Sequence, residues 1–557
     1  KILSQGERLP TTWPVQGTTG YEFMNDIEDV FVDPNGFREI ETHYRAMRRL
    51  VDSRFADAAR GGKRAVLEGP LRADVVRLAR RLAPLAREAG QHWTNDELAT
   101  GITDFIVALP VYRTYVAQAP ANDIDRAVID RALTKLADPK EPIANFVAEA
   151  VRQSSEFTRK LQQVSGPATA KGVEDTALYQ YVPLVSVNEV GGGPDRPIPH
   201  SVERFHAGNI HRAARWPLSL TATNTHDTKR SADLRARLDA LSEIPAEWDR
   251  SVHRWRRLNA KHRQTIDGRL APDTNSEYLI YQTLVGIWPP PRTGRRADDI
   301  PDRGWRLAAR ERLVQYVIKA SREAKIRTSW TEPNLQYEEA LGKFVAAILE
   351  PGEDAPFLVD VSRLVSRIGG IGAWSSIARI ALHLTSPGTP DTYQGDECWT
   401  FTLVDPDNRR PIDYLRRAEL LQSPRDFWAD PFDHRFKQHI VNQLLTLRHD
   451  RAELFMQGSY SPLLVHGARA DHVVAFARTL GDRCVITIAP RLVGEWIAAG
   501  RPDTWWGDTA VVLPLEFADT HLRSVLSPAA EQDVVPSSGK LELAALLRTI
   551  PVAVLAD

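Results

Sequence analysis

The segment Thr223–Arg230, with the sequence TNTHDTKR, places a carboxylate and an imidazole side by side. It follows the apolar stretch Trp216–Ala222, which predicts a short buried strand that ends just before His226 and Asp227. An acid and an imidazole at the carboxyl end of a strand are typical of the chemistry of α/β barrels. Asp227 could equally cap the helix predicted from Ser231 to Leu241, and His226 could be a hydrogen-bonded structural histidine. Carboxylate catalysis on sugars requires a pair of acids, so Asp227 would need a partner elsewhere.

A second polar cluster could lie at the same end of the fold. Gly388–Glu397, with the sequence GTPDTYQGDE, follows a strand predicted at Ile380–Leu384 and offers Asp391 and Tyr393. Its proline, aspartate and glycine residues are equally typical of a turn. The sequence therefore leaves a binding loop and a plain turn open for this cluster.

Two further clusters contain acids or aromatic rings. Lys171–Tyr179, with the sequence KGVEDTALY, carries the neighbours Glu174 and Asp175, whose side chains diverge in a regular segment. They are therefore poor candidates for a facing pair of acids. Gly17–Tyr21 is a turn-rich entry to a second short element, and Tyr21 could stack on a sugar ring.

Composition excludes several classes of function. The chain has 71 Lys and Arg against 72 Asp and Glu, and a net charge of −1 gives no support for nucleic-acid or membrane-surface binding. Cys398 and Cys484 have no metal-ligand spacing, and such sparse cysteine fits a reducing compartment. No apolar run approaches the roughly 18 residues of a membrane helix. Walker-type, HExxH, CxxC and GxSxG motifs are also missing from the sequence, which disfavours nucleotide, zinc and serine-hydrolase chemistry.

Periodicity divides the chain into segments. At 557 residues we expect one large barrel domain with one or two accessory domains. Apolar residues at helical spacing predict a helical insertion over residues 38–165, with Lys1–Leu3 as the tail of a strand. Helices are again predicted at Trp248–Leu258, Tyr278–Trp288, Trp305–Lys325 and Tyr337–Leu349. From about residue 455, alternating runs at 472–478, 483–488 and 509–513 predict antiparallel strands.

These motifs, in this order, resemble glycoside hydrolase family 13, the α-amylase family, and within it the maltooligosyltrehalose synthases. Asn224–Asp227 is similar to the family's fourth sequence region, at the end of barrel strand seven, and Gly388–Glu397 is similar to its strand-eight loop. Glu174–Tyr179, Asn188–Gly192 and Thr225–Ser231 are similar to segments particular to the synthases. The resemblance runs from Lys1 to about Pro411, and we expect it to continue to the end of the chain.

The resemblance implies a fold and a set of site residues. The fold class would be α/β, as the C-terminal part of a (β/α)8 TIM barrel with a large helical insertion and a C-terminal antiparallel β domain. Its segments would be residues 1–37 after barrel strand five, the insertion at 38–165, the remaining barrel with helical excursions at 166–450, and the β domain at 451–557. Asp227 would be catalytic as a stabiliser of the transition state, assisted by His226. The substrate-binding residues would be Thr225, Lys229, Arg230, Tyr21, Lys171, Glu174, Tyr179, Glu189, Asp391 and Tyr393.

The resemblance also implies a reaction. A maltooligosyltrehalose synthase is an isomerase that works by retention and converts the reducing-end α-1,4 link of a maltooligosaccharide into an α,α-1,1 link, in trehalose biosynthesis. It requires no metal and no organic cofactor. We expect a cytoplasmic enzyme that acts alongside a trehalose-releasing hydrolase. Gln180, where the resemblance leads us to expect arginine, and Gly193, where it suggests an acid, depart from the pattern.

The nucleophile and the general acid of the synthase pattern have no match in this sequence. The resemblance places both upstream of Lys1, in the first half of the barrel, so we expect the chain by itself to be inactive and its half barrel to leave open sheet edges. Two alternatives stay open. One is another hydrolase of the family, which releases trehalose or cleaves α-1,4 links, and the other is a non-catalytic glucan-binding remnant.

Overall fold

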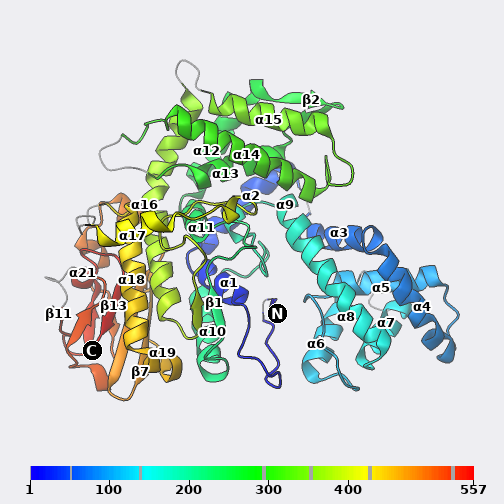
Figure 1. Ribbon diagram of the computed structural model, residues 1–557, viewed down its shortest axis with the longest axis horizontal. Coiled ribbons are helices and arrows are strands. Elements are labelled where there is room, and N and C mark those ends of the chain that lie inside the picture. Colours follow the sequence, from blue (N-terminus) through cyan, green and yellow to red (C-terminus); the bar gives the residue numbers. More distant parts are fainter. Residues whose placement is uncertain are drawn as a thin grey trace.

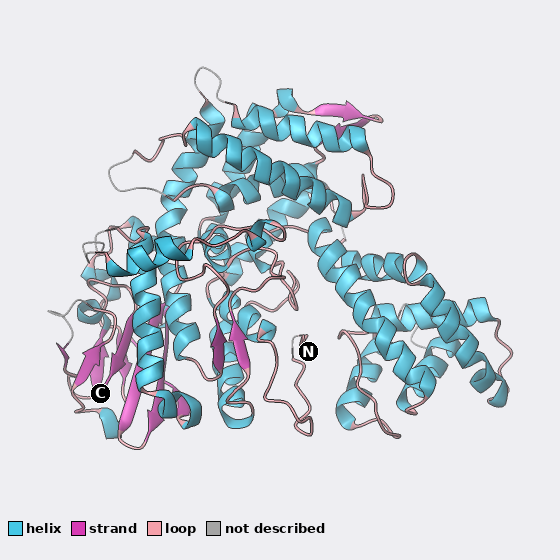
Figure 2. Cartoon of the chain, in the orientation of Figure 1, coloured by secondary structure: helices cyan, strands magenta, loops and turns pink. Residues whose placement is uncertain are grey.

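The computed structural model describes residues 2–4, 6–50, 53–136, 141–290, 296–350, 355–423, 430–527 and 533–557. Figure 1 shows a central part that contains α1, β1, α10 and α11, with a helical group at its right and a second helical layer above it. Most of the strands lie together at the lower left, as Figure 2 shows. The site motifs of the sequence belong to the central part.

The helical group on the right consists of helices that share one apolar core. Its members are α3 (Phe55–Glu68), α4 (Arg72–Glu88), α5 (Asn95–Ala108), α6 (Asp123–Thr134), α7 (Pro142–Arg152) and α8 (Glu156–Thr169). Thr94 and Glu97 form a capping box at the start of α5, and Asn122 caps α6. The helices predicted for this region from apolar spacing are therefore confirmed.

A continuous helical stretch joins this group to the central part. α8 passes into a π-helix at Ala170–Ala177, which passes into α9 (Leu178–Gln180). The π-helix crosses α3 at two glycines, and a Cβ on Gly62 would lie 2.0 Å from the carbonyl oxygen of Gly172. The two backbones are therefore in direct contact. A π-helix inside a longer helix is often found at a functional site.

The central part consists of helices and a short parallel sheet that packs on α1. Its helices are α1 (Tyr21–Val30), α2 (Pro34–Arg48), α10 (Ser201–Arg215), α11 (Ala232–Asp239) and the long α16 (Pro356–Thr385). β1 (Leu220–Ala222) pairs in parallel with β4 (Thr389–Asp391). Gly20, at a φ of 87°, precedes α1 where the backbone packs on β1, because a Cβ there would lie 2.7 Å from the amide nitrogen of Ala222. This close approach brings Tyr21 to the end of β1.

Two strand predictions are wrong, and a third is too long. Ile380–Leu384 is not a strand but part of α16, where its apolar residues pack between α11, α18 and β8. A short apolar run has the same appearance in a buried helix and in a buried strand, so periodicity could not separate them. Ile2–Ser4 is not in a strand either, and Lys1 lies outside the described residues. Of the stretch Trp216–Ala222, only the last three residues form β1.

The helical layer above the centre has the elements predicted from the sequence. It comprises α12 (Pro245–Leu258), α13 (Thr274–Ile287), α14 (Arg303–Ala324), α15 (Leu335–Leu349) and the hairpin of β2 (Gln264–Ile266) and β3 (Arg269–Ala271). The four helices predicted between residues 240 and 350 are therefore confirmed. α2, although it lies within the segment of the predicted insertion, packs on α12.

The C-terminal part contains two antiparallel sheets with the strand orders β11-β10-β13-β8-β7-β5 and β12-β9-β6. Its helices are α17 (Tyr414–Gln422), α18 (His434–Asp450), α19 (Ala452–Gln457), α20 (Gly494–Ala498) and α21 (Leu543–Leu546). Its strands are β5 (Ser459–Pro462), β6 (Val465–His466), β7 (Val473–Leu480), β8 (Arg483–Pro490), β9 (Ala510–Val512), β10 (Leu522–Ser524), β11 (Asp533–Val534), β12 (Lys540–Glu542) and β13 (Ala553–Ala556). The antiparallel strands predicted at 472–478, 483–488 and 509–513 are confirmed as β7, β8 and β9.

None of the described helices is both long and apolar enough to cross a membrane. In the same part of the chain, no group of three or more His, Cys, Asp and Glu side chains could hold a metal ion.

Candidate active site

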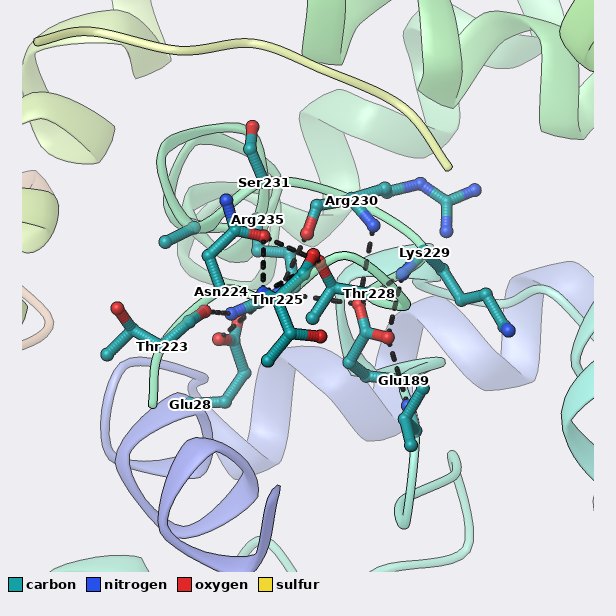
Figure 3. A network of polar contacts seen from close by, with 12 residues as sticks. Glu28, Glu189, Thr223, Asn224, Thr225, Thr228, Lys229, Arg230, Ser231 and Arg235 are labelled. Carbon is teal, nitrogen blue, oxygen red and sulfur yellow. Dashed lines mark hydrogen bonds and ion pairs between the residues drawn. The ribbon is translucent and has the colours of Figure 1, made fainter. Parts of the chain in front are cut away.

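The carboxylate of Glu189 holds the backbone of the TNTHDTKR segment after β1. Its Oε1 accepts the amide hydrogen of Lys229 at 2.8 Å, and its Oε2 accepts that of Arg230 at 3.3 Å. The guanidinium of Arg235, in α11, donates to Oε2 at 3.3 Å. Figure 3 shows the Glu189 carboxylate at the backbone of Lys229 and Arg230, whose side chains extend away from it. Both carboxylate oxygens are therefore committed to fixing the loop.

The front of the segment is a turn tied by its own side chains. The Asn224 amide oxygen accepts from the Thr225 backbone at 3.1 Å and from the Thr228 hydroxyl at 2.5 Å. The Thr225 hydroxyl accepts the amide hydrogen of Asp227 at 3.1 Å and lies 3.2 Å from the Tyr21 phenol oxygen. Asp227 is half-buried and His226 is exposed. The turn thus brings Asp227 near enough to Tyr21 for its charge to raise the pKa of that phenol.

A buried ion network lies beneath this turn. Arg235 donates to Glu28 at 2.9 Å, and its guanidinium also contacts the carbonyl oxygen of Thr223. Arg379, in α16, lies 3.5 Å from Glu28 and 2.8 Å from Asp239. Buried charges of this kind are costly unless each one is paired and hydrogen-bonded. The network therefore binds α1, α11 and α16 together at the base of the loop.

Lys229 is a buried cation among acidic groups. Its ammonium lies 3.4 Å from Asp175, which also pairs with Lys171 at 2.6 Å. Burial by itself would lower the pKa of Lys229, but the charges of Tyr179, Asp175, Glu189 and Glu174 more than offset it and raise that pKa above its ordinary value. Lys229 therefore carries a fixed positive charge at the site.

Glu174 reaches the site from the π-helix. It accepts a hydrogen bond from the Tyr112 phenol, and the same oxygen accepts the amide hydrogen of Gly191 at 3.1 Å. Burial raises the pKa of Glu174, and the Tyr112 hydrogen bond and the charge of Lys229 offset part of that rise. The charge of Asp227 also raises the pKa of Glu174, so the two carboxyl groups lie close enough to interact.

The structure gathers most of the predicted site residues but spreads some of them apart. Tyr21, Thr225, Asp227, Lys229, Glu174 and Glu189 are linked by the contacts above, and Tyr179 is near enough for its charge to act on Lys229. The Arg230 side chain leaves the loop and donates to the Val185 carbonyl at 3.2 Å and to the Tyr316 phenol at 2.5 Å.

The remaining predicted residues lie at the rim. Lys171 is exposed and pairs with Asp175, and Asp391 is exposed at the end of β4. Tyr393 donates to the carbonyl oxygen of Asn408 at 3.1 Å. The Asn408 amide donates in turn to the carbonyl oxygen of His226 at 3.2 Å.

Sequence reasoning missed the residues that reach the site from outside its motifs. Tyr112 comes from the loop after α5, and Arg235 lies within α11. Neither residue belongs to a local motif, since a single tyrosine or arginine in a helical region is usually structural. Asp396, inside the Gly388–Glu397 cluster, accepts from the Asn224 amide at 3.0 Å, and burial raises its pKa to about 6.

The Tyr112 contact gives a testable expectation. In Tyr112→Phe, Glu174 loses a donor that favours its ionised form, so its pKa should rise further. Carbon-13 NMR titration of labelled glutamate carboxyl groups measures this pKa. Tyr393→Phe is the matched control, because that phenol bonds to Asn408 and not to Glu174. An unchanged or lower pKa of Glu174 in Tyr112→Phe would show that the hydrogen bond has no such effect.

A hydrogen-bonded loop after a parallel strand, with carboxyl groups and aromatic rings near it, is an arrangement suited to carbohydrate chemistry. No family model matches the chain. It is 34% identical over 520 residues, or 92% of its length, to proteins of two Mycobacterium tuberculosis strains that carry the provisional name maltooligosyl trehalose synthase. The chain spans 60% of the length of these curated relatives.

Solved structures agree with this similarity. The structure of maltooligosyltrehalose synthase from Arthrobacter ramosus matches 100% of this chain with a TM-score of 0.82 and 34% identity, over 65% of its own length. The structure of a hypothetical maltooligosyl trehalose synthase from Sulfolobus tokodaii matches with a TM-score of 0.72 and 27% identity. This match covers 100% of the present chain and 65% of the Sulfolobus tokodaii chain. The resemblance inferred from the motifs is therefore confirmed: in sequence and fold, this chain is similar to maltooligosyltrehalose synthases.

Proposed function

We propose that this chain carries the transition-state-stabilising part of a maltooligosyltrehalose synthase. The reaction would be an intramolecular transglucosylation that turns the terminal α-1,4 link of a maltooligosaccharide into an α,α-1,1 link. The similarity to such synthases along the whole chain, at a TM-score of 0.82, is the observation that carries the proposal. In this proposal Asp227 stabilises the positively charged transition state, and His226 assists in binding sugar hydroxyls.

The contacts support different roles for the other residues, some in binding substrate and some in holding the loop. Lys229 and Glu174, whose charges act on each other, are proposed to grip the detached glucose, together with Tyr21 and Tyr179. Glu189 and Arg230 would act indirectly, since their polar atoms hold the loop and its surroundings. Lys171, Asp391 and Tyr393 would line the outer part of the binding site. Holding a detached glucose also requires a site that keeps water out.

We also propose that β1 and β4 are the seventh and eighth strands of a (β/α)8 barrel completed by a further polypeptide segment. Among the described residues, each of these strands has only the other as a neighbour. Leu218 and Leu220 are 48% and 38% exposed beside this short sheet. Parallel strands are usually covered on both faces, so an exposed two-stranded sheet favours a missing partner. The nucleophile and the general acid would come from that segment, and the helical group of α3 to α8 would cover the pocket.

A chimera tests the proposal. The part of the Arthrobacter ramosus synthase that this chain does not match would be joined ahead of residue 1 and assayed with maltopentaose. We expect reducing ends to disappear while the length of the product stays the same. Asp227→Asn should lower kcat by about 10²- to 10³-fold, because it removes a preorganised charge from the transition state.

Asp482→Asn, in the exposed turn between β7 and β8, is the matched control and should leave kcat unchanged. New reducing ends would show a hydrolase of the same family instead. Maltopentaose binding without any turnover would favour a non-catalytic glucan-binding protein.

A further inference from the structure

A polar cavity lies within the helical layer, where α13 and α14 meet the hairpin of β2 and β3. Its volume is about 320 Å³, and its wall includes the start of α13, the end of α14 and the side chains of Arg48, Arg269 and Arg327. Tyr179 forms one side of it. At roughly 30 Å³ per water molecule, the cavity has room for a ligand much larger than a single ion.

The charges around this cavity do not balance. Three guanidinium groups line it, against the single carboxylate of Asp273. That carboxylate caps α13 through the amide hydrogens of Asn275 and Ser276 and accepts the Tyr337 phenol at 2.8 Å, and its single negative charge leaves the wall with a net positive charge. Within the described residues, none of the three arginines forms an ion pair with a carboxylate.

Neutral groups hold two of these arginines in place. Arg48 donates to the carbonyl oxygen of Gln180 at 2.8 Å and to the Tyr44 phenol at 2.5 Å. Arg327 donates to the carbonyl oxygen of Ile266 at 3.3 Å, and its guanidinium lies 4.8 Å from the centre of the Tyr337 ring. Carbonyl oxygens and rings orient a guanidinium without neutralising it. Arg48 and Arg327 thus keep their positive charge, and their remaining N–H groups can donate to a ligand.

Arg269 completes the set from the hairpin. It is exposed at the start of β3 and has no hydrogen-bond or ion-pair partner among the described residues. Guanidinium groups bind phosphate through paired, charge-assisted hydrogen bonds, which makes arginine the usual choice for recognising phosphate esters. Thr274 also lines the cavity: its hydroxyl accepts from Arg256 at 3.4 Å and keeps its own hydrogen to donate to a hydroxylated ligand, whereas the Ser276 hydroxyl already donates to Asp273.

We propose that this cavity binds the phosphate group of a small phosphorylated sugar. The three guanidinium groups contact the phosphate oxygens, and the rest of the cavity accommodates the hydroxylated carbon skeleton. The cavity adjoins the candidate active site at Tyr179 but includes no residue of the Asn224–Arg230 loop, and binding there does not depend on the proposed transglucosylation. Because the attraction is electrostatic, it weakens as the salt concentration rises.

Isothermal titration calorimetry on the full chain at low ionic strength tests this proposal. The probes are glucose 6-phosphate, inorganic phosphate and glucose. We expect glucose 6-phosphate to bind more tightly than inorganic phosphate, and glucose to give no detectable heat. Arg269→Met and Arg327→Met should each weaken glucose 6-phosphate binding by about tenfold, through the loss of one charge-assisted contact.

Arg303→Met is the matched control. Arg303 is exposed at the first turn of α14, and the cavity lies at the far end of that helix, about 30 Å away at 1.5 Å per residue. Unchanged binding in Arg303→Met with weakened binding in Arg269→Met supports the site. Because the Arg269 side chain has no partner in the part of the chain that the structure describes, its variant should melt like the parent chain, and loss of binding then reports the site alone. Binding of glucose as tight as that of its phosphate, no binding of either phosphate probe, or equal weakening in all three variants would overturn the proposal.

Discussion

Gly62→Ala should destabilise the protein by about 3 kcal/mol, at the upper end of the cost of overpacking a core. The new Cβ would lie 2.0 Å from the carbonyl oxygen of Gly172, in the π-helix that crosses α3. Because the obstacle is backbone, no side chain can rotate out of the way. The two helices must separate, and the contact between the helical group and the central part weakens. Thermal unfolding monitored by circular dichroism measures the loss.

The neighbouring glycine provides the control. Gly61 lies in the same helix, and a Cβ there meets no atom within 4 Å. Alanine should therefore stabilise the helix at this position by about 0.5–1 kcal/mol, since glycine loses more backbone entropy on folding. Alanine substitutions at these two adjacent positions should thus change the free energy of unfolding in opposite directions. A similar effect of both on the melting temperature would show that the Gly62–Gly172 contact is not tight in solution.

Glu189→Ala should destabilise the protein by an amount similar to that of Gly62→Ala, because it frees the loop after β1. Removing one partner of a buried, hydrogen-bonded charge pair typically costs about 3–5 kcal/mol, because the other partner stays buried without its counter-charge. Here Arg235 and the amide hydrogens of Lys229 and Arg230 would all lose their acceptor. Hydrogen exchange should therefore accelerate at these two amides, together with a fall in the melting temperature.

A carboxylate on the surface serves as the comparison for Glu189. Glu453 pairs with Arg483 at 3.0 Å, but the two side chains are 63% and 35% exposed. Glu453→Ala should cost no more than about 1 kcal/mol, as is usual for exposed ion pairs. If Glu189→Ala cost as little, with unchanged exchange at the loop amides, then the loop would be held by contacts other than this carboxylate.

Much of the fold could be predicted from the sequence because its helices and longer strands are regular. α4 and α5 show a clear apolar stripe, Thr94 caps α5, and β7 and β8 are two buried apolar runs joined by a turn. Ile380–Leu384 could not be assigned, since a segment buried on all sides loses the periodicity that separates helix from strand. The π-helix also has no sequence signature of its own. Its form depends on the crossing with α3, which is a tertiary contact.

The candidate site could be predicted where its residues lie together in motifs. Thr223–Arg230, Glu174 and Glu189 were all singled out, but the sequence could not show that both oxygens of Glu189 point at backbone amides. Tyr112 stands 62 positions from Glu174, and Arg235 stands 207 positions from Glu28. Contacts over such distances depend on how the elements pack. A single sequence without an alignment carries no record of these pairs.

The helical stretch from α8 through the π-helix to α9 is one uninterrupted rod from Glu156 to Gln180. It is packed at one end within the helical group, and further along it carries the carboxylates of Glu174 and Asp175. Such a rod works as a lever: a tilt of the helical group would displace both acids, and with them the counter-charge of Lys229. The charge balance around Lys229 in the loop after β1 thus depends on the position of the helical group of α3 to α8.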